Sequence, residues 1–422
     1  MGLFDLYSST VPEHTRHDID IALVPAARSS PATPLTTTTS RPVDLPLELV
    51  FDIIELAALA PATEPDRATL RACALVSRTW RAPAQSLLYR NFVLRDATTA
   101  QVFATTLKAR PALADAVRTL RATVDRNQPD GLSPRTFAQV VSRCSRLETV
   151  HLALFGSATV ASNAEDRGNE ENSMFDADTL ALLAAGPKVT SLHLANWSSD
   201  KCVLFDLLEA WPCAPRALSL AGVPPSLPIR APPQCVIALE ALRINCTGPL
   251  APDFAEWLLR DARLRALDIA RTWEGEALRL LEAQGSALEA LALPALHEHE
   301  LVGAVRDGCP ALRSLTVAGA CLAPAFWYGE ASQLEHLAVG QSHGTNLGAV
   351  LRAVHGGKLR TLTLRSTPDG VRHPQLAPIR VACTMYGVDF NITSDVRRFK
   401  ALTADVFSAS AASDMFAQLA AC

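Results

Sequence analysis

The residues whose side chains are best suited to catalysis or metal binding are four consecutive ones, His297, Glu298, His299 and Glu300. Imidazole and carboxylate groups can hold a metal ion or transfer protons, but a metallopeptidase needs the pattern H-E-x-x-H on one helix face. Here the two histidines are too close in sequence, and the segment follows an apolar core at which a loop is due. We therefore interpret the cluster as solvated loop charge, with metal binding as the less favoured alternative.

No other arrangement that catalysis requires is found in the sequence. No G-x-S-x-G, G-x-x-x-x-G-K-[ST] or G-x-G-x-x-G motif frames a strand, turn and helix. The ten cysteines form no C-x-x-C pair, and they are expected to be reduced, buried thiols. We expect a protein that is not an enzyme and that needs neither a metal nor a cofactor.

The charge balance and the hydropathy argue against nucleic acid and membranes as partners. Lys and Arg number 39 against 43 Asp and Glu, which gives a net charge of −4, whereas a nucleic-acid-binding domain needs a basic stripe. No apolar run approaches the roughly 18 residues of a membrane-spanning helix, and the N-terminus lacks the basic stretch of a secretory signal. We expect a cytoplasmic and/or nuclear protein.

The elements that would position functional side chains begin near residue 42. Residues 1–41 are rich in Ser, Thr, Pro and Ala without periodicity, so they are expected to form a disordered tail. After them, Pro46 and Glu48 suit the first turn of a helix, where proline lacks an N–H that is not needed and glutamate favours the positive helix end. The apolar stripe of this helix, which includes Leu49 and Ile53, is too wide to face solvent. It must be covered by neighbouring helices or by a second protein.

Residues 42–94 resemble the F-box, in the form common in large fungal families. The motifs that carry the resemblance are Leu45-Pro46 with Glu48-Leu49, then Leu75-Val76-Ser77-Arg78-x-Trp80-Arg81, then Leu88-Tyr89. The resemblance implies a small three-helix domain that docks on the Skp-family adaptor of a cullin–RING ubiquitin ligase. The resemblance implies that Leu45, Pro46 and Leu49 contact the adaptor. It implies that Leu75, Val76 and Trp80 pack the small bundle and border this interface, and we add Ile53 to the expected adaptor-binding residues because it continues the apolar stripe. A generic three-helix cap on the following domain is the alternative.

Residues 95–140 are expected to form a helical connector, and residues 141–395 are repetitive. The repeated unit is apolar-x-x-apolar-x-apolar, and its copies begin at residues 147, 189, 215, 239, 264, 288, 312, 334 and 359. A period near 24 with this core resembles leucine-rich repeats, although the usual Asn or Cys after the core is absent. A strand and a helix in each repeat predict an α/β fold, a curved leucine-rich-repeat-like solenoid with a parallel sheet.

Two segments interrupt or end the repeats. Residues 157–175 are polar and acidic, and we expect a solvated loop there, with a recognition element as the alternative. Residues 381–392 are expected to close the solenoid as a strand or a capping segment, because its last apolar face must be hidden. Residues 396–422 are expected to form a C-terminal helix or tail.

Strand alternation predicts which side chains line the concave side of such a solenoid. Three columns of aligned positions, one of which pairs His151 with His193, contain 19 Ala, Ser, Thr or Gly among 27 residues. This surface is poor in the residue types that dominate interface energies. We therefore expect substrate recognition by loop aromatics, namely Trp273, Trp327 and Tyr328.

These patterns predict a substrate-recruiting subunit of a Skp–cullin–F-box ubiquitin ligase. It would bind the adaptor through residues 42–94 and a protein substrate through the repeats, and it would act by proximity without a covalent intermediate. The alternative is a leucine-rich-repeat scaffold whose helical cap does not engage an adaptor. No recognisable motif in the sequence identifies the substrate.

Overall fold

A computed structural model describes residues 45–58, 66–156, 174–211, 215–227, 238–271, 273, 275–319, 322–323, 326, 333–340, 347–356, 358–365, 373–395 and 399. The chain divides into two compact units, residues 1–45 and 46–422, and all the helices and strands named below belong to the second. The predicted tail at residues 1–41 lies outside the described residues, as do most of the insertion and of the C-terminal segment.

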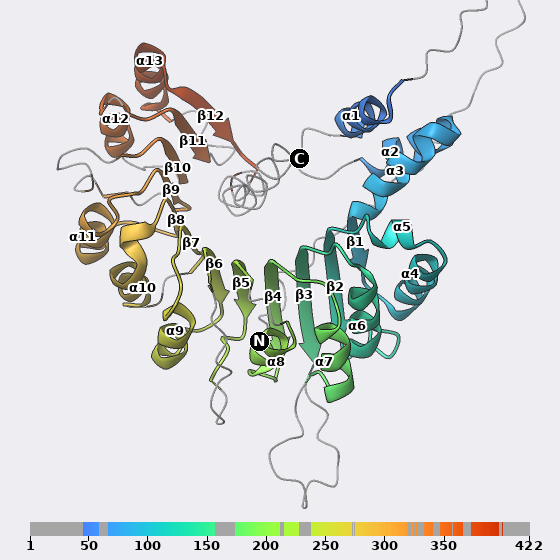
Figure 1. Cartoon of the computed structure of the whole chain (residues 1–422). Coiled ribbons are helices and arrows are strands. Elements are labelled where there is room, and N and C mark those ends of the chain that lie inside the picture. Colours follow the sequence, from blue (N-terminus) through green and yellow to red (C-terminus); the bar gives the residue numbers. More distant parts are fainter. Residues whose placement is uncertain are drawn as a thin grey trace, which may run out of the picture. The chain divides into compact units, whose positions relative to one another are not determined.

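The fold is α/β, and within the described ranges it contains one sheet of twelve parallel strands whose spatial order is their order in the chain (Figure 1). The strands are β1 (Asn91–Leu94), β2 (Thr119–Asp125), β3 (Thr149–Gly156), β4 (Ser191–Ser198), β5 (Ala217–Gly222), β6 (Ala241–Cys246), β7 (Ala266–Ile269), β8 (Ala290–Leu293), β9 (Ser314–Val317), β10 (His336–Gly340), β11 (Thr361–Arg365) and β12 (Asp389–Thr393).

The same ranges contain thirteen α-helices and one short 3-10 turn, η1 (Gly285–Ala287). The helices are α1 (Leu47–Ala58), α2 (Arg67–Val76), α3 (Arg78–Arg90), α4 (Ala97–Ala109), α5 (Pro111–Ala114), α6 (Pro134–Arg143), α7 (Ala177–Ala184), α8 (Val203–Ala210), α9 (Pro252–Leu259), α10 (Glu276–Gln284), α11 (His299–Gly308), α12 (Gly348–His355) and α13 (Leu376–Tyr386). Helices α6 to α13 lie on one face of the sheet (Figure 1). We term this the helix face and the opposite side the open face.

The apolar positions of the repeated unit form the core between the sheet and the helix face. In β4, for example, Leu192 and Leu194 are buried, whereas His193 between them faces the open side. The predicted register is confirmed, because Ser191 pairs with Thr149 on one side and with Ala217 on the other. The leucines therefore stack from strand to strand into one continuous core.

Successive units of the sheet are also joined by buried hydrogen bonds between a side chain of one unit and the backbone of the unit before it. The Asp200 Oδ2 accepts from the Met174 N–H at 2.8 Å, the Glu276 Oε1 from the Leu250 N–H at 2.9 Å, and the Gln375 Oε1 from the Leu347 N–H at 2.6 Å. Each acceptor stands just before or at the start of one helix, and each donor just before the preceding helix. A backbone N–H with no helical partner is thereby satisfied.

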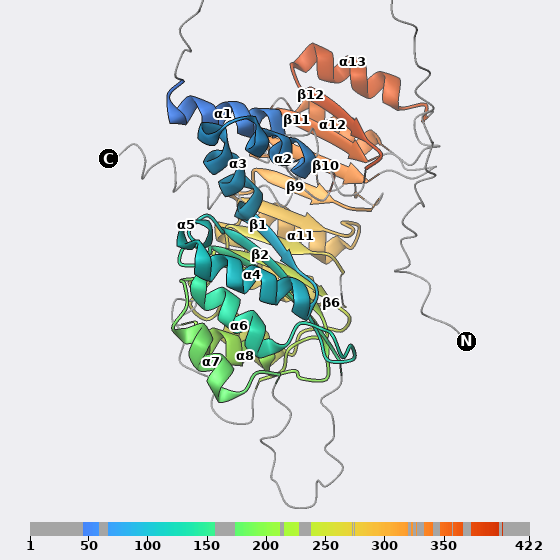
Figure 2. The same ribbon diagram turned by 90° about the vertical axis from the view of Figure 1, so that its right-hand side faces the viewer.

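Helices α1, α2 and α3 precede the sheet, and α3 leads directly into β1 (Figure 2). Three aromatic rings bind this junction together. Tyr89 at the end of α3 stacks on Phe92 of β1 with ring centroids 6.0 Å apart, and Phe92 stacks on Phe103 of α4 at 3.6 Å. The Arg67 guanidinium of α2 also donates to the Asn91 carbonyl at 3.0 Å.

The prediction of a purely helical connector over residues 95–140 is wrong. The segment contains α4, α5 and the start of α6, but also β2, which pairs with both β1 and β3. The sheet therefore begins at Asn91 rather than near residue 141. The end of the predicted polar insertion differs too, because Met174 and Phe175 are buried against the core.

Candidate functional site

The first three helices form a small bundle with an apolar core of its own. Its buried residues are Val50, Ile54, Ala58, Leu70, Cys73 and Ala84. Ser77 separates α2 from α3 with an extended backbone, and its hydroxyl accepts from the Trp80 N–H at 3.2 Å, which caps α3. An ion pair of 3.1 Å between Arg90 and Glu55 ties α3 to α1.

Helix α1 carries two apolar stripes, of which the bundle covers one. Val50, Ile54 and Ala58 follow one another at a spacing of four and are buried. Leu49 and Ile53 have the same spacing one position earlier, and their side chains are 48% and 41% exposed. The bundle therefore leaves part of the wide stripe uncovered, as an interface for a second protein would require.

Six of the seven residues expected to contact or border the adaptor are exposed, namely Leu45, Pro46, Leu49, Ile53, Leu75 and Val76. Leu75 and Val76 are 87% and 64% exposed because α2 ends at Val76, before the chain turns at Ser77. They do not pack inside the bundle. Trp80 is half-buried against the bundle core instead.

The three aromatic residues predicted to bind substrate are not brought together by the described structure. Trp273 is half-buried between β7 and α10, whereas Trp327 and Tyr328 lie outside the described residues. Trp197, at the end of β4, is another large apolar side chain, and it is exposed.

A second candidate surface crosses the open face of the sheet. Strand register aligns a row of side chains, one from each of β2 to β7, and we name it the histidine row: Arg121, His151, His193, Ser219, Arg243 and Asp268. The sequence pattern aligned the last five. It missed Arg121, although the alternation of Leu120, Ala122 and Val124 with polar residues is a strand signal.

The two imidazoles of this row are stacked on one another. The ring centroids of His151 and His193 lie 4.1 Å apart with an interplanar angle of 10°, and the Ser191 hydroxyl lies 3.2 Å from the His193 Nε2. Burial lowers the pKa of His151 to about 3, assisted by His193 and by the charge of Arg121. Burial likewise lowers the pKa of His193 to about 4, assisted by Arg243 and Arg121. Both imidazoles are therefore neutral at physiological pH.

The far end of the row is an ion pair. The Arg243 Nε lies 3.0 Å from the Asp268 Oδ2, and the Asp268 side chain is only 8% exposed. In the neighbouring column of the open face the side chains are small, since Ala241, Ala266 and Ala290 form a buried cluster. The predicted smooth surface is therefore present along this column of alanines, whereas the histidine row beside it carries imidazoles and charged side chains.

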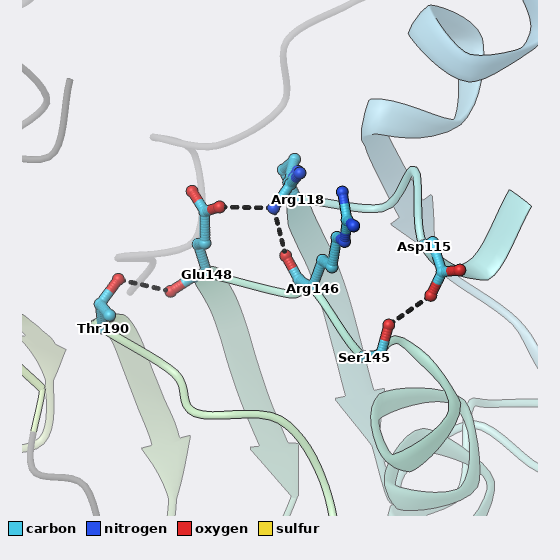
Figure 3. A network of polar contacts seen from close by, with 6 residues as sticks. All are labelled: Asp115, Arg118, Ser145, Arg146, Glu148 and Thr190. Carbon is cyan, nitrogen blue, oxygen red and sulfur yellow. Dashed lines mark hydrogen bonds and ion pairs between the residues drawn. The ribbon is translucent and has the colours of Figure 1, made fainter. Parts of the chain in front are cut away.

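A third polar feature runs along the edge of the sheet at which the strands begin. One residue before each strand from β2 to β11 contributes to it, and we name it the edge ladder: Arg118, Glu148, Thr190, Arg216, Glu240, Arg265, Glu289, Arg313, Glu335 and Arg360. Figure 3 shows its first members. The Arg118 Nη1 donates to the Glu148 Oε1 at 2.7 Å, and the Thr190 hydroxyl donates to the Glu148 carbonyl at 3.2 Å.

The charges of the edge ladder alternate, so that most members have opposite neighbours. Further ion pairs along the ladder join Arg216 to Glu240, Arg265 to Glu289, Arg313 to Glu335, and Arg360 to Glu335. The arginine side chains of these pairs are largely exposed, Glu240 and Glu335 are partly buried, and their charges are satisfied by one another. The ladder therefore favours the alignment of the strands and offers no group for catalysis.

The described residues offer little for metal or thiol chemistry. They bring no three His, Cys, Asp or Glu side chains together in a way that could hold a metal ion. Cys202 is half-buried, whereas the other described cysteines are buried. Burial raises the pKa of the Cys144 and Cys246 thiols to about 12, which keeps them protonated and unreactive.

Comparison with known proteins adds no family to these observations. No protein-family model matches the chain, and a search of curated proteins finds no significant match. No helix in the described ranges is long and apolar enough to cross a membrane. The chain is thus defined by its fold as an α/β protein with a parallel sheet, and by two candidate surfaces, the exposed apolar side chains of α1 and α2 and the histidine row.

Proposed function

We propose that this chain is the substrate-recruiting subunit of a Skp–cullin–F-box ubiquitin ligase. The observation that carries the proposal is the exposure of apolar side chains at the positions of the F-box motif. Leu49 and Ile53 are exposed on α1 although the neighbouring Val50 and Ile54 are buried. A chain selected only for the stability of its bundle would have no need of apolar side chains at the outward positions.

The energetics of burial favour docking at these positions. Transfer of a leucine or isoleucine side chain from water to an interface is worth about 1.5–3 kcal/mol when burial is complete. Leu49, Ile53, Leu75 and Val76 are all exposed by more than two fifths. A partner that covers them in an apolar groove would gain several such contributions, and the Skp-family adaptor is the partner that the motif resemblance names.

The sheet is the part that would hold a protein substrate. We propose that it is a leucine-rich-repeat-like solenoid, since its parallel strands follow one another without exchange of order and helices α6 to α13 lie on one face of the sheet. The ligase subunit then acts by proximity, because a substrate held on the sheet has a raised effective concentration near the ubiquitin-charged enzyme. No cofactor and no covalent intermediate enter this mechanism, and the site of action is cytoplasmic and/or nuclear.

The test is a binding measurement between the full-length chain and a purified Skp-family adaptor. We expect Leu49→Asp combined with Ile53→Asp to weaken binding by at least about a hundredfold, because two carboxylates would have to be desolvated in the interface. Val102→Asp is the matched control, since Val102 is an apolar residue on α4 that is 62% exposed. Circular dichroism verifies that each variant is folded.

Two results would contradict the proposal in different ways. Undiminished adaptor binding by the folded double variant would show that the exposed residues of α1 are not the docking surface. No adaptor binding by the unaltered chain would favour the alternative function, a repeat scaffold whose helices α1 to α3 only cap the sheet. The tight junction formed by Tyr89, Phe92 and Phe103 is the observation that favours this alternative.

A further inference from the structure

The histidine row differs chemically from the rest of the open face. Between Arg121 and Arg243 the strands present two imidazoles and the hydroxyls of Ser191 and Ser219. The carboxylate at the end of the row, Asp268, is already paired with Arg243 at 3.0 Å. None of the described helices α4 to α13 covers this face (Figure 1).

The spacing of the row suits an extended chain that crosses the strands. Arg121 on β2 and Arg243 on β6 are four strand spacings apart, which corresponds to about 19 Å. About six residues of an extended peptide cover that length. The stacked His151 and His193 lie between the two arginines, and both cations lie close enough to act on His193.

We propose that the histidine row binds an acidic peptide segment, with a side-chain oxyanion seated over the His151–His193 pair between Arg121 and Arg243. The inference rests on the proposed function only in so far as the segment belongs to the ubiquitin-ligase substrate. Complementary charge is the reason for this partner, because the proposed position lies between the Arg121 and Arg243 cations beside groups that can donate hydrogen bonds, whereas the Asp268 carboxylate is buried against Arg243. The small side chains beside the row allow a backbone to approach the sheet closely.

Binding at this site is coupled to proton uptake. Burial and, to a lesser degree, the charges of the two arginines keep both imidazoles neutral, and an anion between the arginines would offset their charge and favour imidazolium. The charged and titratable groups that face the pair are Arg121 from β2, Arg243 from β6 and Asp268 from β7, while β5 contributes the uncharged Ser219. Acidic peptides therefore bind more tightly as the pH falls.

The experiment uses the full-length chain without adaptor and a fluorescein-labelled peptide of alternating Ser and Glu, with a Ser and Gln peptide as the uncharged control. Fluorescence anisotropy is measured at about pH 7.5 and about pH 5.5, which lie on either side of the usual histidine pKa. We expect the acidic peptide to bind at least about tenfold more tightly than the control, and to gain at least about threefold in affinity on acidification. A phosphoserine version of the peptide tests whether the preferred oxyanion is a carboxylate or a phosphate. The acidic peptide that binds more tightly identifies the preferred group.

Three variants separate this site from other surfaces. Arg121→Gln should weaken binding by about tenfold or more, and His151→Gln with His193→Gln should remove the gain on acidification. Arg380→Gln is the control, because Arg380 is an exposed arginine on α13 at the helix face. Thermal unfolding verifies that the double histidine variant is folded.

The proposal is overturned if Arg121→Gln and the double histidine variant bind the acidic peptide as the unaltered chain does. It is also overturned if Trp273→Ala abolishes binding while the variants of the row do not, which would favour the loop aromatic. The adaptor is absent from the peptide assay, and the peptide is absent from the adaptor-binding measurement. Failure at the histidine row therefore leaves the ligase proposal intact. Failure of adaptor docking likewise leaves the peptide measurement intact.

Discussion

The guanidinium of Arg265 and the carboxylate of Glu289 form a two-pronged ion pair across the starts of β7 and β8. The Arg265 Nε donates to the Glu289 Oε1 at 3.0 Å, and the Nη2 donates to the Oε2 at 2.9 Å. The arginine hydrogen bond holds the pKa of the Glu289 carboxyl below its usual range, and the charge of Arg313 on the following strand acts in the same direction. Glu289 therefore interacts with both of its neighbours in the edge ladder.

Exchange of the two charges should destabilise the protein although the pair itself is retained. In Arg265→Glu with Glu289→Arg, the new glutamate lies beside Glu240 and the new arginine beside Arg313, so two like-charge contacts arise. We expect a loss of about 1 kcal/mol at low salt, reduced at high salt, because these side chains are exposed. Urea unfolding measures it.

The control for this prediction is the same exchange in the pair Arg90 and Glu55, which lies outside the ladder. We expect that exchange to change the stability by less than about 0.5 kcal/mol. Equal stabilities for both exchanged variants would mean that the alternation of charge has no energetic role.

The stacked histidines should make the protein lose stability on acidification. Their folded pKa values of about 3 and about 4 lie below the unfolded value of 6.5, so the unfolded chain binds more protons from about pH 6.5 down to about pH 3. The contribution of the neutral pair is fully present above pH 6.5 and is lost as the pH falls through this window. We expect His151→Gln with His193→Gln to flatten the decline of the unfolding free energy, measured in urea at a series of pH values.

His355→Gln is the matched control for the pH series, because His355 is an exposed histidine on α12. It should leave the decline unchanged. An identical decline in the unaltered chain and in the double histidine variant would be inconsistent with burial of neutral imidazoles at the row.

Replacement of Glu276 by glutamine should stabilise the protein at neutral pH. Glu276 is 3% exposed, its Oε1 accepts from the Leu250 N–H, and its Oε2 has no hydrogen-bond partner among the described residues. Burial raises the pKa of this carboxyl, so the folded state favours the protonated form and stability falls as the pH rises above about 4.5. Glutamine keeps the acceptor for Leu250 without the charge.

We expect Glu276→Gln to raise the unfolding free energy by about 1 kcal/mol near pH 7.5, and the gain to shrink towards pH 4 as the native carboxyl becomes protonated. Glu276→Ala should cost about 1–3 kcal/mol, because the buried Leu250 N–H would lose its partner. Glu282→Gln changes an exposed residue of the same helix and should have little effect. A less stable Glu276→Gln protein at neutral pH would argue that the charge itself is required.

Two glycines with similar backbone angles should differ in their tolerance of alanine. Gly222 at the end of β5 has φ +85°, and an added Cβ would collide with the Asn196 carbonyl, which accepts from the Val223 N–H at 2.6 Å. Gly387 after α13 has φ +68°, but an added Cβ there meets no atom within 4 Å. We expect Gly387→Ala to cost about 1–2 kcal/mol from backbone strain alone. Gly222→Ala should cost at least about 3 kcal/mol from strain and collision together. Thermal unfolding measures the stability of both variants, and equal losses of stability would contradict the steric explanation.

The repeated apolar pattern was enough to predict the parallel sheet from residue 147 onward and the alignment of its strands. Leu192 and Leu194 recur at the same positions as Val150 and Leu152, and a period-two pattern with one buried face leaves a single register that keeps every leucine inside. The pairing of His151 with His193 followed from that register without any knowledge of the structure. The exposed stripe of α1 also followed from sequence, since Leu49 and Ile53 exceed what one helix of a small bundle can bury.

The neighbours of those side chains depend on contacts between segments that are far apart in the chain. Strand β1 has four residues, too few for a period to be recognised, and β12 alternates apolar with polar residues while most of its side chains remain exposed, so both become strands only by pairing with a neighbour. Strand β2 added Arg121 to the histidine row, because pairing with β3 sets Arg121 beside His151. The local sequence pattern indicates which face a residue occupies. Atoms far away in the chain determine the stacking of the two rings, the depression of their pKa values and the exposure of Leu75.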